Sequence, residues 1–335
     1  MSEKLESENL PTVSIVIAAY NAMTYLPKTL SSVFNQTFQD YEIIIVDDGS
    51  TDSIRSWAAS LPDPRVVFIS QANAGSAAAR NTGIARARGK YVAFLDADDL
   101  WAESKLEEQV AILEQQPETG VVYSWVAAID ETDASQGKVI QNSYSGDVLA
   151  DLIEHDILEC GSNPMIRKAC FETTGVFDPR LRYAQTWDMW LRLAKEFPFH
   201  CIKKPLTFYR FHANNTSKKW ENMEYCLNLI VQKTFSNISP DLKHLEGRSY
   251  AFVSLHVAWK MLQNRSQGGS HAFRTWLKAV RYYPKIVFSK ESIRFITAFL
   301  IVQVFGLGNY NRFRDMLYLL KKGIKKSPSA QEITT

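Results

Sequence analysis

Short apolar runs and amphipathic stretches alternate over the first hundred residues of the chain. Each apolar run is rich in β-branched residues and ends in turn-forming residues, which is typical of a buried strand. These runs predict strands over Val13–Ala19, Glu42–Val46, Arg65–Ile69 and Tyr91–Leu95. Apolar residues at helical spacing predict helices from about Tyr25, over Ser53–Ser60 and over Ser76–Ala87. Because strands that alternate with helices form βαβ units, we predict an α/β fold with a mostly parallel sheet flanked by helices.

The pattern changes from Val121 onward. Strands are predicted over Val121–Ile129 and Lys138–Tyr144, on either side of a polar turn, and a helix over Asp188–Glu196. Beyond Trp220 the chain has the pattern of helices separated by loops. We therefore predict a helical C-terminal region behind the α/β part.

The composition is that of a folded protein with an uneven charge. Of the 335 residues, 46% are hydrophobic and 22% are charged, so a packed core is expected. The formal net charge of +2 gives no reason to expect a nucleic-acid partner. From His271 to Lys326, however, twelve Lys and Arg face two acidic residues. This stretch, 271–326, predicts either peripheral contact of basic, aromatic helices with an anionic membrane surface or an appendage that packs on the preceding domain.

Cysteine use and hydrophobic segments favour a cytoplasmic location. The four cysteines lie far apart, without the close pairs of a zinc site or the density of a disulfide scaffold. The segment MSEKLESENLP lacks the apolar centre of a secretory signal. The longest apolar run, Phe295–Leu307, is shorter than the roughly 18 residues of a membrane-spanning helix. We expect a cytoplasmic protein, with association with the cytoplasmic face of the membrane as the alternative that the basic stretch leaves open.

Polar clusters follow three predicted strands at their carboxyl ends. They are Ala19-Tyr20-Asn21, Asp47 to Asp52, and Asp96-Ala97-Asp98-Asp99. In open α/β sheets, ligands bind outside these strand ends. Neighbouring carboxylates such as Asp96 and Asp98 repel each other unless a cation compensates, and Mg²⁺ or Mn²⁺ binds one or two carboxylates together with substrate phosphates. We therefore predict a divalent-cation site here, with a solvated acidic turn or a helix cap as the alternative.

Motifs of several other enzyme classes are missing. The chain has no G-x-G-x-x-G after its first strand, no G-x-x-x-x-G-K-[ST] loop and no G-x-S-x-G nucleophile elbow. The negative charge of a bound phosphate must therefore be neutralised by a cation and by basic side chains. Arg80 is a candidate for this role, and an ordinary arginine on a helix surface is the alternative.

The segments SIVIAAYN, SSVFNQTF, YEIIIVDDGSTD and NAGSAAARNTGIARARGKYVAFLDADD occur in this order, and together they resemble the family 2 glycosyltransferases with the GT-A fold. The resemblance implies a nucleotide-diphospho-sugar donor, a divalent cation (Mn²⁺ or Mg²⁺), and inversion of the anomeric carbon by direct displacement. With it, we expect a disordered tail over 1–11, a GT-A domain over 12–217 with a donor half (12–100) and an acceptor half (101–217), and a helical region over 218–335.

The resemblance also implies roles for residues of the donor half. Ala18, Tyr20 and Asn21 would line the nucleotide pocket. Asp48 would face the uracil or another base, and Arg80 would contact the phosphates. The expected donor is thus a nucleotide-sugar, with a UDP-sugar as the first choice.

For the cation, the resemblance implies Asp96 and Asp98 as the D-x-D pair, with Asp98 as the direct ligand, and His212 as a metal or phosphate contact. The acceptor side departs from the family's Glu-Asp-Trp-Asp-x-Trp-Leu-Arg, because Thr186 stands at the usual position of the catalytic base. Asp188 is the best available base in this segment if the chain is extended there, because residues two apart share a face in a strand but not in a helix.

We therefore predict an inverting glycosyltransferase of polysaccharide biosynthesis, with a glycan, a lipid-linked molecule or another hydroxyl compound as its acceptor. One alternative is a catalytically retired relative that binds nucleotide-sugars or glycans, and Thr186 favours it. The other is a nucleotidyltransferase, which is expected to have a glycine- and Lys/Arg-rich loop where this chain has Ala18-Ala-Tyr-Asn21.

Overall fold

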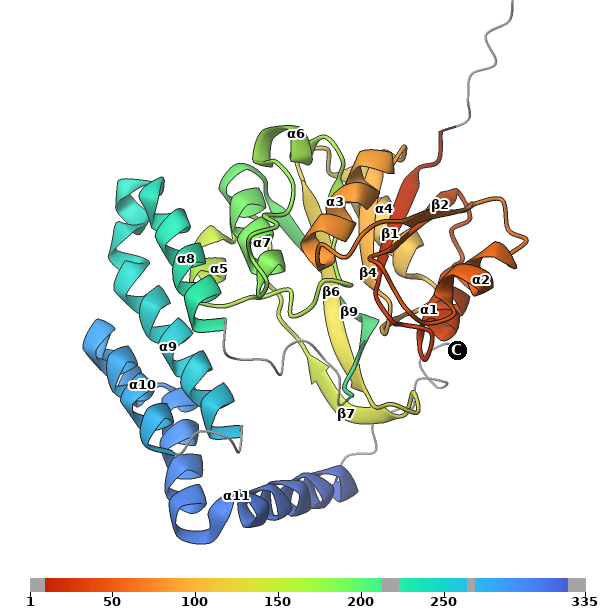
Figure 1. Ribbon diagram of the computed structural model, residues 1–335. Coiled ribbons are helices and arrows are strands. Elements are labelled where there is room, and N and C mark those ends of the chain that lie inside the picture. The colour runs from red at the N-terminus through yellow and green to blue at the C-terminus, as the bar shows by residue number, and fades with distance from the viewer. Residues whose placement is uncertain (1–9, 213–222, 264–268, 325–335) are drawn as a thin grey trace, which may run out of the picture.

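The computed structural model describes residues 10–212, 223–263 and 269–324. The chain forms an α/β body and a helical C-terminal region that lies along one side of it (Figure 1). Nine strands make one sheet, with a hydrophobic core on each of its faces. The predicted α/β fold with a helical C-terminal region is therefore confirmed, whereas the predicted tail over 1–11 lies almost wholly outside the described residues.

Four parallel strands make the first half of the sheet. In spatial order they are β3 (Val66–Ser70), β2 (Tyr41–Asp47), β1 (Val13–Ala19) and β4 (Tyr91–Asp96). The strands β1, β2 and β4 are buried on both faces, which explains their unbroken apolar sequences. The crossover helices are α1 (Leu26–Phe34), α2 (Ile54–Ala59) and α3 (Ser76–Arg86). Every helix or strand end that the sequence analysis predicted here lies within one residue of the end in the structure.

The helix α3 lies very close to β1. A Cβ atom at Gly83 would lie 2.2 Å from Cγ1 of Val16, a separation that no side chain tolerates. Together with Ala77 and Ala79, which are also buried in the helix, this glycine lets the helix backbone approach the sheet. The N-terminal end of α3 is thereby fixed beside the carboxyl edge of the parallel strands.

The second half of the sheet mixes strand directions. β8 (Met165–Arg167) pairs antiparallel with β4 and with β6 (Val121–Ile129), whereas β9 (Phe199–Arg210) runs parallel to β6. β5 (Leu100–Trp101) and β7 (Ser135–Ile140) complete the sheet as antiparallel partners of β9 and β6. The sheet is therefore parallel where the sequence alternates strand and helix, and mixed beyond Val121.

The sequence pattern is less informative in this half. β6 has the predicted bounds, but β7 lies three to four residues before the predicted Lys138–Tyr144. β8 is too short to show a period, and the exposed Lys203 and Lys204 interrupt the apolar pattern of β9. Both strands exist because neighbouring strands pair with them, which no local pattern records.

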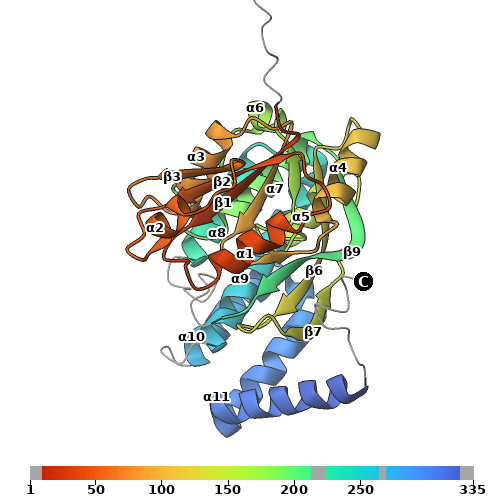
Figure 2. The same ribbon diagram turned by 90° about the vertical axis from the view of Figure 1, so that its right-hand side faces the viewer.

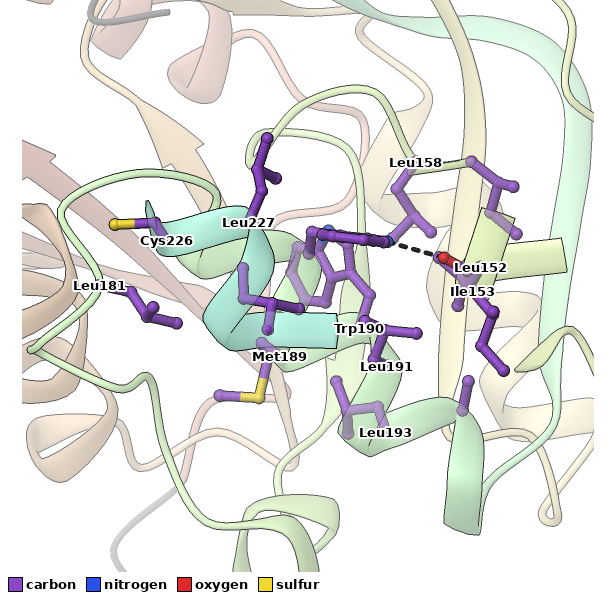
Figure 3. Packing of buried hydrophobic residues seen from close by; sticks show 14 of the residues in the cluster. Leu152, Ile153, Leu158, Leu181, Met189, Trp190, Leu191, Leu193, Cys226 and Leu227 are labelled. Carbon is purple, nitrogen blue, oxygen red and sulfur yellow. Dashed lines mark hydrogen bonds between the residues drawn. The ribbon is translucent and has the colours of Figure 1, made fainter. Parts of the chain in front are cut away.

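A long helix anchors the larger of the two cores. The helices of this half are α4 (Lys105–Gln115), α5 (Leu149–Glu154), α6 (Cys170–Thr174) and α7 (Gln185–Glu196). Trp190 of α7 is fully buried, and Figure 3 shows it among Leu152, Leu158, Leu193 and Leu227. The helix begins three residues before the predicted Asp188, which has a consequence for the acceptor side.

The C-terminal helices extend this core. They are α8 (Met223–Ser236), α9 (Glu246–Gln263), α10 (Gly269–Tyr282) and α11 (Lys290–Ile324), with short 3₁₀ helices at Pro240–Leu245 and Pro284–Phe288. Leu227 of α8 and Leu255 of α9 belong to the same buried cluster as Trp190. The hydroxyl of Ser249 donates a 2.8 Å hydrogen bond to the carbonyl of Ile153. α8 and α9, which precede the basic stretch 271–326, therefore pack on the α/β body.

The helix α11 differs from the others because much of it is exposed. It bends at Gly306, whose φ of 78° and ψ of 158° are not helical, and its two arms point in different directions (Figures 1 and 2). The segment Lys290–Tyr310 has a mean hydropathy of 1.4 and is, by length and composition alone, able to cross a membrane. The sequence analysis did not single out this segment because it counted only uninterrupted apolar residues, whereas the helix includes polar and charged residues on both sides of Phe295–Leu307.

Candidate functional site

The polar clusters predicted at the strand ends meet at one edge of the sheet. Parallel pairing sets Ala19 of β1 opposite Asp47 of β2, and Ala18 opposite Asp96 of β4. Ala18 is half-buried, so it lies at the boundary between the core and the surface of this edge. Residues from three strands therefore border the same surface, as expected of a ligand site on an open α/β sheet.

Asn21 ties the end of β1 to the loop after β2. Its backbone is left-handed, with a φ of 50°. Its Oδ1 accepts a 2.8 Å hydrogen bond from the N–H of Thr51, and its own N–H donates to Oγ of Ser50 at 2.9 Å. These bonds hold the neighbouring Tyr20 in an exposed position, with its ring open to a flat group such as a nucleotide base.

Asp48 is buried and holds the loop that leads into α3. Its Oδ1 accepts hydrogen bonds from Nε2 of Gln71 at 2.8 Å and from the N–H of Ala74 at 2.9 Å. Its Oδ2 accepts a 2.8 Å hydrogen bond from the N–H of Gly75. The carboxylate therefore shapes the predicted nucleotide pocket from behind, and its predicted contact with a base stays a prediction.

Arg80 and Asp96 form a close ion pair at the end of β4. Nη2 of Arg80 lies 2.5 Å from Oδ1 of Asp96, and the Arg80 side chain is almost fully buried. Gly161 covers the pair, because a Cβ atom there would lie 3.1 Å from Nη2 and 3.2 Å from Oδ2. Nη1 of Arg80 is buried and has no hydrogen-bond partner among the described residues. A buried donor of this kind is suited to an anionic ligand.

Asp98 and His212 form the second pair at this edge. Oδ2 of Asp98 lies 2.8 Å from Nε2 of His212, whose ring packs against Tyr25 at 4.9 Å between centroids. Burial and the charge of Asp96 raise the pKa of Asp98, and the hydrogen bond from His212 offsets part of this rise. The structure thus brings together Asp98 and His212, which lie 114 residues apart in the sequence.

The described residues contain no group of three or more His, Cys, Asp and Glu side chains arranged to hold a metal ion. Asp98 and His212 nevertheless offer a carboxylate oxygen and an imidazole nitrogen side by side. Mn²⁺ and Mg²⁺ commonly take one or two protein ligands and complete their coordination with substrate phosphates. The pair therefore fits a cation that arrives with a diphosphate, whereas Asp96 is engaged by Arg80.

Three residues that support the site were not singled out from the sequence. Asp99 is fully buried and accepts hydrogen bonds from Oγ of Ser162 at 2.5 Å and from the N–H of Arg210 at 2.9 Å. Burial, with the charges of Asp98 and Asp96, raises the pKa of Asp99 well above its usual range. Nε of Arg210 donates to the carbonyl of Asp98 at 2.6 Å. Asp99 has a signal in the sequence as the third acid of Asp96-x-Asp98-Asp99, and Arg210 as the arginine two residues before His212, whereas Ser162 has none.

On the acceptor side, the structure shows how Asp188 lies relative to Thr186, which stands at the usual position of the catalytic base. Because α7 begins at Gln185, Thr186 and Asp188 lie in the same helix, two residues apart, and face different ways. Asp188 is buried, and its two oxygens lie 2.9 Å from Nη2 of Arg192 and 2.6 Å from Nζ of Lys233. Its carboxylate therefore joins α7 to α8 in an ion-pair network. This geometry does not favour the predicted role of Asp188 as the catalytic base.

A family model and curated relatives agree on the class of this chain. The model of glycosyl transferase family 2 matches residues 14–175. The putative teichuronic acid biosynthesis glycosyltransferase TuaG of Bacillus subtilis is 34% identical over 220 residues, which are 63% of this chain and 84% of TuaG. An uncharacterized glycosyltransferase of Haemophilus influenzae is 28% identical over 323 residues, which are 88% of this chain and 98% of that protein.

Some relatives are much longer. Chondroitin synthase of Escherichia coli is 30% identical over 274 residues, and the match spans 78% of this chain but 38% of that protein. The chain therefore corresponds to one part of such relatives and to nearly the full length of others.

Solved structures share the fold. TarS 1–349 of S. aureus in complex with UDP-GlcNAc superposes with a TM-score of 0.62 at 15% identity, covering 89% of both chains. The mannosyltransferase PcManGT of Pyrobaculum calidifontis in complex with GDP-Man and Mn²⁺ superposes with a TM-score of 0.57 at 18% identity, covering 94% of this chain and 87% of that chain. At these identities the likeness establishes the fold, which is of the GT-A type.

Proposed function

Because the chain belongs to glycosyl transferase family 2, we propose that it is an inverting enzyme that moves a sugar from a nucleotide-diphospho-sugar to an acceptor hydroxyl with the help of a divalent cation. The observation that carries this proposal is the pair of contacts at the end of β4, Arg80 with Asp96 and Asp98 with His212. They set a buried guanidinium beside two candidate metal ligands, which is the charge distribution that a diphosphate requires.

The nucleotide would lie across the ends of β1 and β2. Tyr20 is exposed there for stacking, and Ala18 and Asn21 form the adjoining wall. The loop held by Asp48 closes the pocket toward α3. The fold neighbours were solved with UDP-GlcNAc and with GDP-Man, so the nucleotide-sugar class is supported and a UDP-sugar is our first choice.

Asp98 and His212 would hold Mn²⁺ or Mg²⁺, and PcManGT was solved with Mn²⁺. When bound, such an ion neutralises charge on the diphosphate leaving group. Arg80 contributes to the same task, because its buried Nη1 can donate to a phosphate oxygen while Nη2 stays on Asp96. The chain's own residues thus orient the donor and stabilise the charge that develops as the glycosidic bond breaks.

The acceptor is proposed to be a saccharide, free or lipid-linked, in polysaccharide biosynthesis. The relatives named above include a putative teichuronic acid biosynthesis enzyme and a chondroitin synthase, and both names refer to polymer assembly.

A peripheral contact with the cytoplasmic leaflet is the second part of the proposal. Ile293, Leu300 and Val304 lie at helical spacing along the outer face of α11, and all three are exposed. Lys290 and Arg294 are exposed beside this apolar row. Apolar side chains flanked by basic ones suit the interface of an anionic membrane, where the first enter the lipid boundary and the second meet the headgroups.

The donor site is tested by nucleotide binding. UDP with Mn²⁺ should raise the melting temperature of the purified protein, because a ligand of the folded state stabilises it by mass action. Asp98→Ala should abolish this rise, and EDTA should do the same for the wild type. The measurement is a thermal-shift titration of UDP with and without Mn²⁺.

The matched control is Glu114→Gln, which removes an exposed carboxylate whose partner Lys90 is equally exposed, outside the site. It should keep the full response to UDP and Mn²⁺. If Asp98→Ala binds UDP as the wild type does, in the presence of Mn²⁺, then the cation does not sit at Asp98 and this part of the proposal is wrong.

A further inference from the structure

Arg210 is the last residue of β9, and its charged side chain is fully buried next to Asp98. Burying a guanidinium costs free energy unless its donors are satisfied. Nη1 of Arg210 donates a 3.0 Å hydrogen bond to the carbonyl of Asp130 and pairs with the carboxylate of Asp133, both in the turn after β6. Nε donates a 2.6 Å hydrogen bond to the carbonyl of Asp98. The side chain therefore ties the loop that carries Asp98 to the turn between β6 and β7.

The backbone around Arg210 is held as well. Its N–H donates a 2.9 Å hydrogen bond to Oδ1 of the fully buried Asp99. The N–H of Phe211 donates a 2.9 Å hydrogen bond to the carbonyl at the end of β6, so the extended chain continues past the strand. Side chains alternate in extended chain, and Tyr209 packs on Phe211 with 4.9 Å between ring centroids. Arg210 and His212 share the other side, where both meet the loop that carries Asp98.

The ring of Tyr25 packs against both of these side chains. Its centroid lies 4.8 Å from Cζ of Arg210 and 4.9 Å from the centroid of the His212 imidazole. A cation at this distance is attracted by the face of an aromatic ring. Tyr25 precedes α1, and its side chain makes no capping hydrogen bond to that helix. Arg210 thus acts on both members of the pair at the end of β4, on Asp98 through its carbonyl and on His212 through the ring of Tyr25.

We propose that Arg210 is a positioning residue of the cation site: it fixes the carboxylate of Asp98 and the imidazole of His212 side by side, so that together they hold a divalent cation on the diphosphate of the donor. This inference rests on the proposed function. Groups that orient the ligands of a metal ion affect its affinity strongly, and their loss typically weakens binding by about 10–100-fold.

The role of Arg210 differs from that of Arg80. The buried Nη1 of Arg80 has no hydrogen-bond partner among the described residues and can donate to a phosphate oxygen. The guanidinium of Arg210 is instead engaged by the carbonyl of Asp98, by the β6–β7 turn and by Tyr25. An arginine that only stabilised the fold would change the free energy of unfolding and leave the affinity for the cation unchanged.

The test is a Mn²⁺ titration of the full-length protein at a fixed concentration of UDP. Bound Mn²⁺ is measured from the loss of the EPR signal of the free ion, and the rise in melting temperature is followed in parallel. Arg210→Lys keeps a positive charge near Asp133, but its single nitrogen cannot also reach the carbonyl of Asp98. The half-saturating Mn²⁺ concentration should rise by about 10–100-fold. Saturating Mn²⁺ should restore most of the thermal response, because Asp98 and His212 are still present.

Tyr25 provides a second pair of variants, which decides the matter even if Arg210→Lys does not fold. Tyr25→Leu removes the ring that joins Arg210 to His212 and should raise the half-saturating Mn²⁺ concentration. Tyr25→Phe keeps the ring and should bind Mn²⁺ as the wild type does.

The matched control is Arg167→Lys. Arg167 of β8 is half-buried, Nη2 donates a 2.9 Å hydrogen bond to the carbonyl of Leu113, and Cζ lies 5.4 Å from the centroid of the Tyr91 ring. It pairs with Tyr91, at the opposite end of β4 from Asp96. This variant should lower the melting temperature of the protein without ligands and leave the half-saturating Mn²⁺ concentration unchanged.

Two outcomes would overturn the assignment. One is a half-saturating Mn²⁺ concentration within about twofold of the wild type in Arg210→Lys or, where that variant does not fold, in Tyr25→Leu. The other is an equal rise in Arg167→Lys, which would attribute the effect to a general loss of stability. Failure of the proposed function looks different, because the wild type itself would then bind no Mn²⁺ in the presence of UDP.

Discussion

Three acidic residues around the site carry the same functional group in different surroundings. Asp96 meets Arg80, Asp98 meets His212, and Asp188 meets Arg192 and Lys233. The carboxylate of Asp188 joins α7 to α8, whereas those of Asp96 and Asp98 lie at the edge of the sheet, where a ligand can meet them. The partners of Asp98 and Asp188 on other elements lie 114 and 45 residues away, so the sequence alone does not tell these acids apart.

Asp188→Asn tests the structural assignment of that acid. Removing its charge leaves Lys233 and Arg192 without a carboxylate at the α7–α8 contact, so the free energy of unfolding should fall by about 1–3 kcal/mol. Both cations are partly solvent-exposed, which keeps this cost below that of a fully buried pair. The measurement is urea denaturation alongside donor hydrolysis per folded molecule. A loss of turnover of 10²-fold or more at unchanged stability would return the role of base to Asp188.

Among the helices and strands, the sequence predicts correctly those whose hydrophobic pattern lies within their own residues. The strands β1, β2 and β4 and the helix α3 are defined by their own residues, and so is the D-x-D pair at the end of β4. β9 and the segment 155–164 depend on partners far along the chain, and their sequences carry a mixed signal. The start of α7 is also of this second kind. The helix begins at Gln185, after Ala184 in a left-handed conformation, and neither a capping side chain nor a glycine marks this start in the sequence.

The contact of α3 with β1 gives a prediction at this scale. Gly83→Ala should destabilise the protein by about 1–3 kcal/mol, because the new methyl group collides with Val16, and this exceeds the gain of about 1 kcal/mol in helix propensity. The double variant Val16→Ala/Gly83→Ala should lose less free energy of unfolding than the two single variants lose together. Denaturant unfolding of the four proteins measures this coupling.

Gly308→Ala in α11 is the control for helix propensity, because nothing lies within 4 Å of a Cβ atom there. It should be neutral or slightly stabilising. Strict additivity of Val16→Ala and Gly83→Ala would mean that the close approach of α3 to the sheet does not depend on the glycine.

At the scale of the whole molecule, α8 and α9 belong to the body while α11 presents apolar side chains outward. Phe288, between the exposed Lys285 and Lys290 in the sequence, is 82% exposed, and Val304 is 71% exposed. A large apolar surface on a soluble monomer is unusual unless it binds something. The proposed occupant is an anionic lipid surface, which the basic side chains would approach first.

The full-length protein should therefore sediment with vesicles that contain anionic lipid, and far less with neutral vesicles. Raising the salt concentration should release it only in part, because screening weakens the charge attraction but not the burial of Leu300 and Val304. Leu300→Glu/Val304→Glu should abolish sedimentation. Val176→Glu, at an exposed valine of the α/β body, is the matched control and should sediment normally. A double variant that still sediments would exclude this face, and a change in its oligomeric state instead would indicate a second copy as the occupant.

The core that α7 shares with α8 and α9 also sets the order of events during synthesis. Leu227 and Leu255, which belong to the same core as Trp190, are made only after the sheet is complete at Arg210. Leu255 follows Arg210 by about 45 residues, which at 5–20 residues per second is a delay of about 2–9 s. During this interval the ribosome holds a finished sheet whose second core still lacks part of its residues. Chaperones that recognise apolar segments therefore have a defined window on this nascent chain, and slowing translation after residue 210 should lengthen it.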